Sequence, residues 1–276
     1  MSSQRVIVTG GGAAGFFAAI TCGNSNPNLE IVLLEKGPQF LSKVRISGGG
    51  RCNVTHSCFD ARELAGRFPR GGQALIGPFR KFQPRDTIAW FESRGVKLKT
   101  EADGRMFPVT DSSQTIIDCL IREGTAARVS FTANRGVESV ARGTADGFLV
   151  TISNGERLRC DKLLLATGGC RTAAAGKLAQ MLGHTLEAPV PSLFTFHIEM
   201  PWLHELAGLS MESVEASVPN TGLKERGPLL MTHRGVSGPV ILRLSAWGWQ
   251  RRMRNGHSAG NVLSRAPRKT GHGSCR

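Results

Sequence analysis

The amino-acid sequence predicts an α/β fold that starts with a parallel sheet, and three observations support this prediction. An apolar run at 5–9 leads into the turn "GGGAAG" and then into an apolar helical stretch from about Ala13 to Cys22. A second apolar run, Glu30 to Glu35, follows at the distance expected of a strand–helix–strand unit. Beyond Pro191, the segments "SLFTFHIEM" and "ESVEASV" have the composition of strands. We therefore expect a Rossmann-like domain followed by a β-rich part.

Further helices and a group of short strands are expected between these parts. Helices are predicted over 73–81, 84–94, 113–122 and 174–182, and the third of them follows the cap candidates Asp111 and Ser112. Between Arg128 and Thr167 the pattern changes to short alternating runs. Asp146-Gly147 and Asn154-Gly155 are typical of hairpin turns within that stretch.

The charge of the chain lies unevenly along its length. The sequence has 35 Lys and Arg against 21 Asp and Glu, a formal net charge of +14. From Gly248 onward there are seven basic residues and no acidic one, which leaves 28 basic and 21 acidic residues, a net charge of +7, in the first 247. The chain has no tyrosine and no recurring aromatic-plus-basic pattern. We expect a small-molecule substrate and no nucleic-acid partner, with a basic nucleic-acid-binding protein as an alternative.

Compartment and metal content follow from the apolar runs and the cysteines. No apolar run approaches the roughly 18 residues of a membrane span, and the first apolar run is too short for a signal peptide. The seven cysteines are odd in number and contain no Cys-x-x-Cys pair. This pattern argues against a disulfide framework and against a zinc site. We expect a cytoplasmic protein with no membrane partner and no metal.

The glycines of the first turn predict a dinucleotide site. Gly10, Gly12 and Gly15 form the pattern G-x-G-x-x-G between a strand and a helix. The first glycine permits the tight turn, the second lets a pyrophosphate approach the backbone, and the third lets the helix pack closely on the strand. The helix N-terminus at Ala13 and Ala14 offers N–H groups and the positive end of a dipole to phosphates. The alternative is a glycine-rich turn in an unrelated α/β protein.

An acidic residue at the end of the second strand completes this pattern. Glu35 lies 20 residues after Gly15, where a carboxylate can accept hydrogen bonds from a ribose. It also disfavours a 2′-phosphate on that ribose. The neighbouring Lys36 is included among the candidate cofactor-binding residues.

A second glycine-rich stretch, "ISGGGRCNVT", follows about a dozen residues after Glu35. Gly48, Gly49 and Gly50 allow backbone to lie against a planar or charged ligand. Arg51 could neutralise a phosphate or lie near the edge of a ring, and Cys52 comes between it and Asn53, which offers both a donor and an acceptor. These residues are expected near the carboxyl ends of the strands.

Five motifs in this order resemble a family of bacterial flavoproteins: "VIVTGGGAAG", "ISGGGRCNVT", "GRMFPVTD", "LLLATGG" and "THRGVSGP". The chain is similar to the BaiN/RdsA-like NAD(P)/FAD-dependent oxidoreductases, also called the aminoacetone-oxidase family, over roughly residues 4 to 247. The resemblance implies the two-dinucleotide-fold flavoprotein type, with FAD bound in extended form. It places adenosine at the first strand–helix–strand unit and the flavin end near Gly48 to Asn53. It implies an FAD-dependent oxidoreductase, with NADH or NADPH as a candidate reductant and no assigned substrate.

The same resemblance implies roles for two further segments. Val137 lies where related flavoproteins place a backbone edge against adenine, and an ordinary core valine is the alternative. Thr167 and Gly168 match the turn that returns the chain to the FAD. After "ATGG" this sequence reads "CRTAAAG" and lacks the aspartate that many family members have there.

No catalytic residue follows from the remaining cysteines and histidines. Cys52 and Cys58 could form a redox pair beside a flavin, but six positions apart on a helix they would face different directions, and small buried cysteines are the alternative. The histidines at 56, 184, 197 and 233 show no pattern of a catalytic triad or a metal site.

The predicted domain organisation has three parts. Residues 1–190 form the FAD-binding domain, 191–247 the start of an inserted β-rich domain, and 248–276 a basic, disordered tail. After Trp247 the sequence leaves the family pattern, which we interpret as a truncation or a change of reading frame. We then expect this chain to bind FAD poorly, to be marginally soluble and to show no NAD(P)H oxidation. A non-catalytic dinucleotide-binding fragment is the alternative.

Overall fold

The computed structural model describes residues 4–143, 146–169, 173–186, 193–218 and 221–254. The chain divides into two compact units. The first unit comprises Met1–Ala65 and Leu75–Pro189, and the second comprises Gly66–Ala74 and Val190–Arg276.

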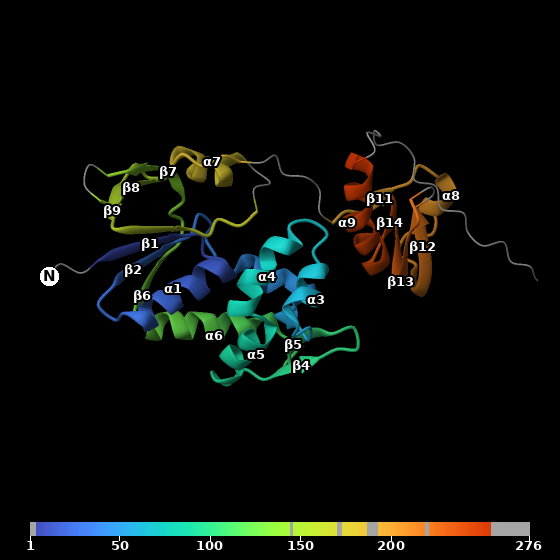
Figure 1. Ribbon diagram of the computed structural model, residues 1–276, viewed down its shortest axis with the longest axis horizontal. Helices are drawn as coiled ribbons and strands as arrows, with labels where there is room; N and C mark the ends of the chain where they lie inside the picture. Colours follow the sequence, from blue (N-terminus) through green and yellow to red (C-terminus); the bar gives the residue numbers. More distant parts are fainter. Residues whose placement is uncertain (1–3, 144–145, 170–172, 187–192, 219–220, 255–276) are drawn as a thin grey trace, which may run out of the picture. The chain divides into compact units, whose positions relative to one another are not determined.

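A four-stranded parallel sheet is the centre of the first unit (Figure 1). Its strand order is β10-β1-β2-β6, and the strands are β1 (Arg5–Thr9), β2 (Glu30–Leu34), β6 (Val129–Thr132) and β10 (Lys162–Leu165). Helix α1 (Ala13–Ser25) connects β1 to the adjacent, parallel β2. The predicted strand–helix–strand unit and the predicted α/β, Rossmann-like class are therefore confirmed.

A layer of structure packs on each of the two faces of this sheet. Alternate residues of a strand point to opposite faces, so neighbouring residues of β1 belong to different cores. Val6 and Val8 belong to a core with α1 and with α6 (Ser113–Ala126). Ile7, between them, belongs to a second core with the antiparallel strands β7 (Val137–Arg142), β8 (Phe148–Ile152) and β9 (Arg157–Cys160). Figure 1 shows the helices on one side of the sheet and β7 to β9 with α7 (Ala173–Met181) on the other.

The segment between β2 and α6 contains short helices and a small antiparallel sheet. The helices are α2 (Ser42–Ile46), η1 (Ser47–Gly50), α3 (Ala61–Gly66), α4 (Gly72–Lys81) and α5 (Pro84–Glu92). The strands β3 (Thr55–His56), β4 (Leu98–Thr100) and β5 (Arg105–Pro108) pair in the order β3-β5-β4. The glycine-rich stretch leads directly into β3, a strand of this sheet.

Most predicted helices of the first unit have the expected position. The predicted helix at 113–122 extends to Ala126, and Ser112 is its cap, since its hydroxyl oxygen accepts a hydrogen bond from the Gln114 N–H at 3.3 Å. Among the described residues no helix is both long enough and apolar enough to span a membrane.

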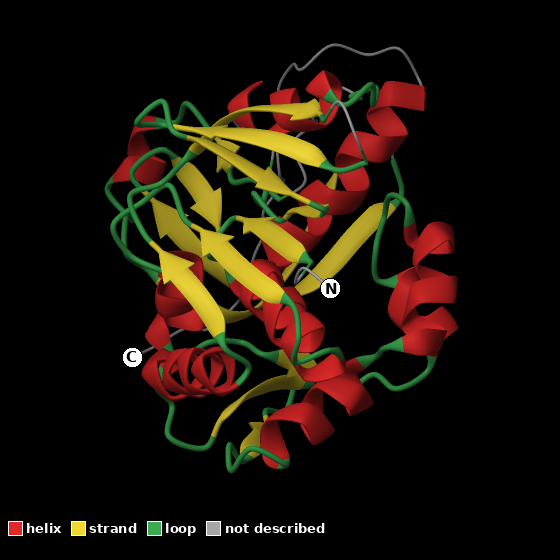
Figure 2. Ribbon diagram, turned by 90° about the vertical axis from the view of Figure 1, so that its left-hand side faces the viewer, coloured by secondary structure: helices red, strands yellow, loops and turns green. Residues whose placement is uncertain are grey.

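Figure 2 turns the first unit toward the viewer, with strands in yellow and helices in red. In its described residues, the second unit has an antiparallel sheet and the helices α8 and α9 (Figure 1). The sheet has the order β11-β14-β13-β12, with β11 (Phe196–His197), β12 (Ser210–Val218), β13 (Leu223–Thr232) and β14 (Gly235–Ser237). Helix α8 (Pro201–His204) precedes β12, and α9 (Pro239–Arg254) follows β14. Val240, Ile241 and Leu244 of α9 are buried with Leu229 of β13 and Val236 of β14 in a separate core.

Two expectations for this unit need comment. The stretch "SLFTFHIEM" is a strand only at Phe196–His197 in its described part, because β11 pairs only with the short β14. Helix α9 continues beyond Trp247 to Arg254, and the rest of the predicted tail, 255–276, lies outside the described residues.

Candidate functional site

A cavity of about 840 Å³ lies at the carboxyl ends of β1, β2 and β10. Its walls include the turn after β1 (Gly10 to Ala14), Glu35 after β2, and Ala166 to Gly168 after β10. β1 pairs with β2 on one side and with β10 on the other. The helix after β1 (α1) packs on one face of the sheet and the helix after the adjacent β10 (α7) packs on the other. Ligands bind at such a switch point in open α/β sheets.

The glycines of the first turn have three different surroundings. Gly10 has φ +111°, and a Cβ there would lie 2.3 Å from the carbonyl oxygen of Ala166. A Cβ at Gly15 would lie 1.9 Å from the carbonyl oxygen of Gly10, so that glycine lets α1 pack on the end of β1. A Cβ at Gly12 would meet nothing within 4 Å. Gly12 is thus the glycine that opens onto the cavity.

The N-terminus of α1 presents backbone N–H groups at the cavity wall. Gly12 is the N-cap, no side chain caps the helix, and its first turn has no acidic residue. Ala13 and Ala14 line the cavity, and the first N–H groups of a helix have no partner inside the helix. With the dipole of α1, they form a site for an anion.

Glu35 lines the cavity and is held by backbone N–H groups. One carboxylate oxygen accepts a hydrogen bond from the Gly11 N–H at 2.7 Å, and the other accepts one from the Gly37 N–H at 2.8 Å. Each carboxylate oxygen can accept a further bond. The neighbouring Lys36 is exposed, and its aliphatic stem lies beside Gly136 instead of lining the cavity.

The three glycines of the second motif adopt left-handed backbone conformations. Gly48, Gly49 and Gly50 have φ values of +57°, +67° and +86°. A Cβ at Gly48 would lie 2.9 Å from the Asn53 nitrogen and from the Phe107 ring, whereas Gly49 and Gly50 have open space around them. The stretch needs glycines for conformation, and two of them leave backbone accessible to a ligand.

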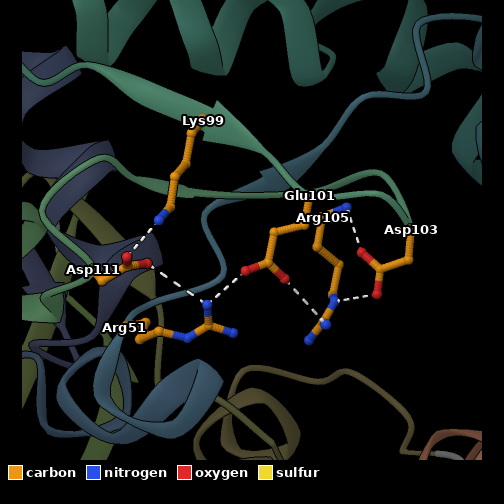
Figure 3. A network of polar contacts seen from close by, with 6 residues as sticks. All are labelled: Arg51, Lys99, Glu101, Asp103, Arg105 and Asp111. Carbon is orange, nitrogen blue, oxygen red and sulfur yellow. Dashed lines mark hydrogen bonds and ion pairs between the residues drawn. The ribbon is translucent and has the colours of Figure 1, made fainter. Parts of the chain in front are cut away.

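Arg51 pairs with carboxylates outside the cavity (Figure 3). Its Nη1 lies 2.6 Å from Glu101 Oε1 and 3.6 Å from an oxygen of Asp111, and its guanidinium carbon lies 4.1 Å from the centre of the Phe107 ring. Lys99 also donates to Asp111. The structure thus gives Arg51 two carboxylate partners, Glu101 between β4 and β5 and Asp111 just after β5. A contact of Arg51 with a phosphate or with the edge of a ring stays a prediction.

Figure 3 shows that this group of charges continues along the hairpin. Arg105 bonds Asp103 at 2.7 Å through Nε and lies 3.3 Å from Glu101 through Nη2. Hydrogen bonding from Lys99 is the main cause that holds the pKa of the Asp111 carboxyl below its ordinary value. We call these six residues, Arg51, Lys99, Glu101, Asp103, Arg105 and Asp111, the hairpin charge network.

Cys52 and Asn53 both line the cavity. Cys52 has φ +63°, uncommon for a residue with a side chain. Burial raises the pKa of its thiol, although a hydrogen bond with the Ser47 side chain acts in the opposite direction. Cys52 and Cys58 are both buried thiols, and Cys58 does not line the cavity. The structure therefore has no disulfide between them.

The remaining candidates divide between cavity and core. Thr167 and Gly168 line the cavity, and Gly168 has φ +80°. Val137 begins β7, and its half-buried side chain packs on the core that contains Ile7. Val137 does not line the cavity, in keeping with the alternative of a core valine.

Sequence reasoning missed Lys43 and an apolar wall. Lys43, on α2, lines the cavity, and its Nζ lies 3.3 Å from the place of a Cβ at Gly168. No carboxylate of the described residues lies within ion-pair distance of it, and Glu35 is the only other charged residue of the lining. The apolar wall comes from α1, α5, α6 and the end of α4: Phe17, Phe82, Phe91, Ile116 and Leu120. A cation three residues before Ile46, where the second motif begins, was the available signal for Lys43.

None of the described histidines lines the cavity, and the described residues contain no group of three side chains suited to a metal ion. His56 lies on β3, and its Nε2 is 3.1 Å from the Asp103 carbonyl oxygen. The segment 170–172, where the sequence departs from the family pattern, lies outside the described residues.

The fold and the site define a protein with a Rossmann-type dinucleotide crevice. The chain belongs to the HI0933-like protein family, whose Rossmann-domain model matches residues 4–241. This finding confirms the resemblance on which the sequence analysis relied.

Two curated relatives are similar to this chain over most of its length. It is 31% identical over 259 residues to the ribosomal RNA dihydrouridine synthase of Escherichia coli, a match that covers 91% of this chain and 62% of the relative. It is 26% identical over 250 residues to the 3-dehydro-bile acid delta(4,6)-reductase of Clostridium scindens, covering 88% and 60%. The chain thus spans about three fifths of the length of these relatives. Among solved structures, THI4 of Thermovibrio ammonificans overlaps 66% of this chain and 62% of its own, with 12% identity and a TM-score of 0.45.

Proposed function

We propose that this protein is an FAD-dependent oxidoreductase. The observation that carries the proposal is the cavity at the switch point of the sheet. Gly12 opens onto this cavity, and the N–H groups at the N-terminus of α1 lie at its wall. A pyrophosphate fits this arrangement because it is an anion that needs close approach to backbone. Flavin, when bound, supplies the hydride and electron chemistry, so the protein needs to supply binding, orientation and exclusion of water.

The residues of the cavity suggest a division of the cofactor along it. Glu35 would accept hydrogen bonds from the adenosine ribose, as its position after β2 and its remaining acceptor capacity suggest. Gly12, Ala13 and Ala14 would hold the pyrophosphate, with Lys43 as the cation of the site. Backbone at Gly49 and Gly50, with the side chain of Asn53, would contact the flavin end.

We propose NADH or NADPH as the reductant, a bacterial source and a cytoplasmic location. The five cysteines of the described residues are thiols, which fits a reducing compartment. The names of the two curated relatives differ in substrate, one ribosomal RNA and the other a bile acid, and the cavity also has an apolar wall of its own. The proposal therefore assigns an oxidoreductase without a single substrate from these names.

Titration with FAD tests the proposal. We expect saturable binding, seen as a change in flavin absorption and fluorescence, and release of intact FAD on denaturation. The titration should extend to millimolar FAD, so that weak binding is detected as well. A chain with the circular dichroism of a folded protein that does not bind FAD would contradict the proposal.

Anaerobic addition of NADH or NADPH to the FAD complex then separates the two functional alternatives. Bleaching of the bound flavin by either nucleotide supports an oxidoreductase. A complex that binds FAD and stays oxidised with both supports a non-catalytic dinucleotide-binding protein.

A further inference from the structure

The apolar wall bounds a part of the cavity that the proposed contacts to the cofactor do not use. Three of its residues, Phe91, Ile116 and Leu120, are buried, whereas Phe82 is 43% exposed. The Phe82 ring packs on Phe17 of α1, with the ring centres 5.3 Å apart. Phe82 is therefore the member of the wall that reaches the protein surface. We call the region bounded by this wall the apolar part of the cavity.

One face of α1 extends from the proposed anion site into the apolar part. Ala13 and Ala14 line the cavity at the N-terminus of α1, and Phe17 and Ala18 line it one turn later. Residues four positions apart lie on the same face of a helix. The apolar part is therefore next to the site proposed for the pyrophosphate, along the same helix.

Helices α5 and α6 each contribute one face in the same way. Thr87 and Phe91 are four positions apart on α5, and Ile116 and Leu120 are four positions apart on α6. Faces of three helices thus bound the apolar part.

The charges of the cavity lie outside the apolar wall. Glu35 and Lys43 are the charged residues of the lining, and neither belongs to the wall. Burial of a charge without a partner costs free energy, so this part favours an uncharged ligand. The rings of Phe17, Phe82 and Phe91 favour a flat ring as that ligand, because aromatic rings pair in stacked or edge-to-face geometry.

Thr87 offers a hydrogen bond to such a ligand. Its Oγ1 lies 3.4 Å from the Gln83 carbonyl oxygen, longer than the roughly 2.5–3.0 Å of an ordinary hydroxyl hydrogen bond. The hydroxyl can therefore donate to a carbonyl group of the ligand instead. The apolar wall itself has no acid and no base, so a reaction of the ligand there needs a proton from elsewhere.

We propose that the apolar part of the cavity binds a quinone, a flat and uncharged ring with two carbonyl oxygens. Thr87 would donate a hydrogen bond to one of these oxygens, and Phe17 and Phe82 would pack against the ring. A quinone is reduced at its oxygen atoms, which exchange protons with water. Its reduction therefore needs no acid from the apolar wall.

The role of the quinone as an electron acceptor rests on the proposed function, whereas its binding does not. Asn53, assigned to the flavin end, is followed by Val54, which lines the cavity and packs on the core that contains Phe91 and Ile116. The flavin end therefore adjoins the apolar part. The quinone would accept a hydride, which is two electrons and a proton, from the reduced cofactor and a second proton from water. The products are a hydroquinone and the oxidised cofactor.

Equilibrium dialysis of duroquinone against the whole chain without FAD tests the binding site. The four methyl groups of duroquinone occupy its free ring carbons, which prevents addition of the Cys52 thiol. We expect saturable binding to the wild type. Ala18→Leu should weaken it by at least about tenfold, because the larger side chain fills close-packed space. Phe82→Ala should weaken it about fivefold, through loss of one ring contact.

The matched control for Phe82→Ala is Phe59→Ala. Phe59 is 40% exposed, like Phe82, but does not line the cavity, so this variant should keep the wild-type affinity for duroquinone. Camphor, an uncharged ketone of similar size that is not flat, should bind at least about tenfold more weakly. The same loss is expected for the duroquinone analogue in which carboxymethyl replaces one methyl group.

Several results would overturn the proposal. They are no binding of duroquinone by the wild type, equal losses in Phe82→Ala and Phe59→Ala, equal affinity for camphor, and displacement of duroquinone by FAD. The last result would assign the apolar wall to the cofactor itself.

Anaerobic mixing of duroquinone with the dithionite-reduced FAD complex tests the electron transfer. We expect the flavin absorption to return at a rate that saturates with duroquinone, and more slowly in Ala18→Leu, which should keep wild-type FAD affinity. A complex that stays reduced would overturn the role as acceptor. Because dialysis needs no cofactor, a chain that binds duroquinone but not FAD would contradict only the proposed function.

Discussion

Gly12 and Gly15, three residues apart in the same turn, predict opposite effects of substitution. A side chain at Gly12 enters open space in the cavity, while a Cβ at Gly15 collides with the Gly10 carbonyl oxygen at 1.9 Å. We expect Gly12→Val to abolish FAD binding and to keep the unfolding midpoint of the wild type. Gly15→Ala should lower the free energy of unfolding by about 1–3 kcal/mol, as overpacked sites do. Thermal unfolding with and without FAD measures both, and wild-type FAD affinity in Gly12→Val would remove this turn from the site.

The positive charge of Lys43 leads to a prediction about which ligands bind the cavity more weakly when that charge is removed. Lys43 is the cation of the cavity lining, and a hydrogen bond to a charged group contributes about 1.5–3 kcal/mol. We expect Lys43→Gln to weaken binding of FAD and ADP at least tenfold and to leave the weaker binding of riboflavin unchanged, since riboflavin has no phosphate. Titrations of the three ligands check this, with the exposed Lys162→Gln as control. Equal losses for riboflavin and FAD would place Lys43 at the flavin end instead.

Individual residues were predictable where one local rule decides their role. The glycine spacing predicted the roles of Gly10, Gly12 and Gly15, because each role depends on the same strand–helix–strand unit. Gly10 permits the turn, Gly12 leaves room for a ligand, and Gly15 lets the helix pack on the strand. Arg51 was different, because its partners Glu101 and Asp111 lie at least 50 residues further along the chain. No spacing rule brings a loop beside a hairpin that distant. The contacts of Arg51 could therefore be found only from the three-dimensional structure.

At the scale of elements, the hairpin charge network joins the glycine-rich stretch to β4 and β5. Arg51 and Glu101 are 36% and 29% exposed, so solvent screens them and their pair contributes little stability. We expect a double-mutant cycle of Arg51→Met and Glu101→Gln to give only a small coupling in unfolding experiments. A larger effect on FAD affinity than on stability would show that the network orients the stretch for the ligand. Coupling absent from both measurements would make the pair an incidental surface contact.

The pH dependence of this network follows from Asp111. Its pKa in the folded protein lies below the ordinary value of 3.8, with Lys99 as the main cause. A lowered folded pKa adds stability above the unfolded value, and this stability is lost as the pH falls through the folded pKa. The contacts of Asp111 should therefore persist to below pH 3.8 and then weaken. In Lys99→Met, the Asp111 carboxyl should titrate closer to 3.8 by NMR, whereas Lys97→Met should leave it unchanged.

Helices and strands were predictable where their own residues show a clear sequence pattern. The apolar runs of β1 and β2 and the capped start of α6 carry local signals, and the structure has them where they were expected. The small sheet of β3, β4 and β5 was missed, since strands of two to four residues have too few positions to show alternation. The apolar wall of the cavity was missed for a related reason. Phe17, Phe91 and Leu120 lie on three helices that meet only in the fold.

At the scale of the whole molecule, two units with separate cores predict two unfolding transitions. The core around Val8 and Ile117 belongs to the first unit, and the core around Ile241 and Leu244 to the second. The cavity proposed for FAD has all its lining residues in the first unit, and a ligand stabilises what it binds by about 2.7 kcal/mol at 100 times its Kd. Calorimetry should therefore show FAD raising one transition and leaving the other in place. Gly12→Val, with FAD added, should show both transitions at their ligand-free positions. A single transition that moves as a whole would mean instead that the two units unfold cooperatively, despite their separate cores.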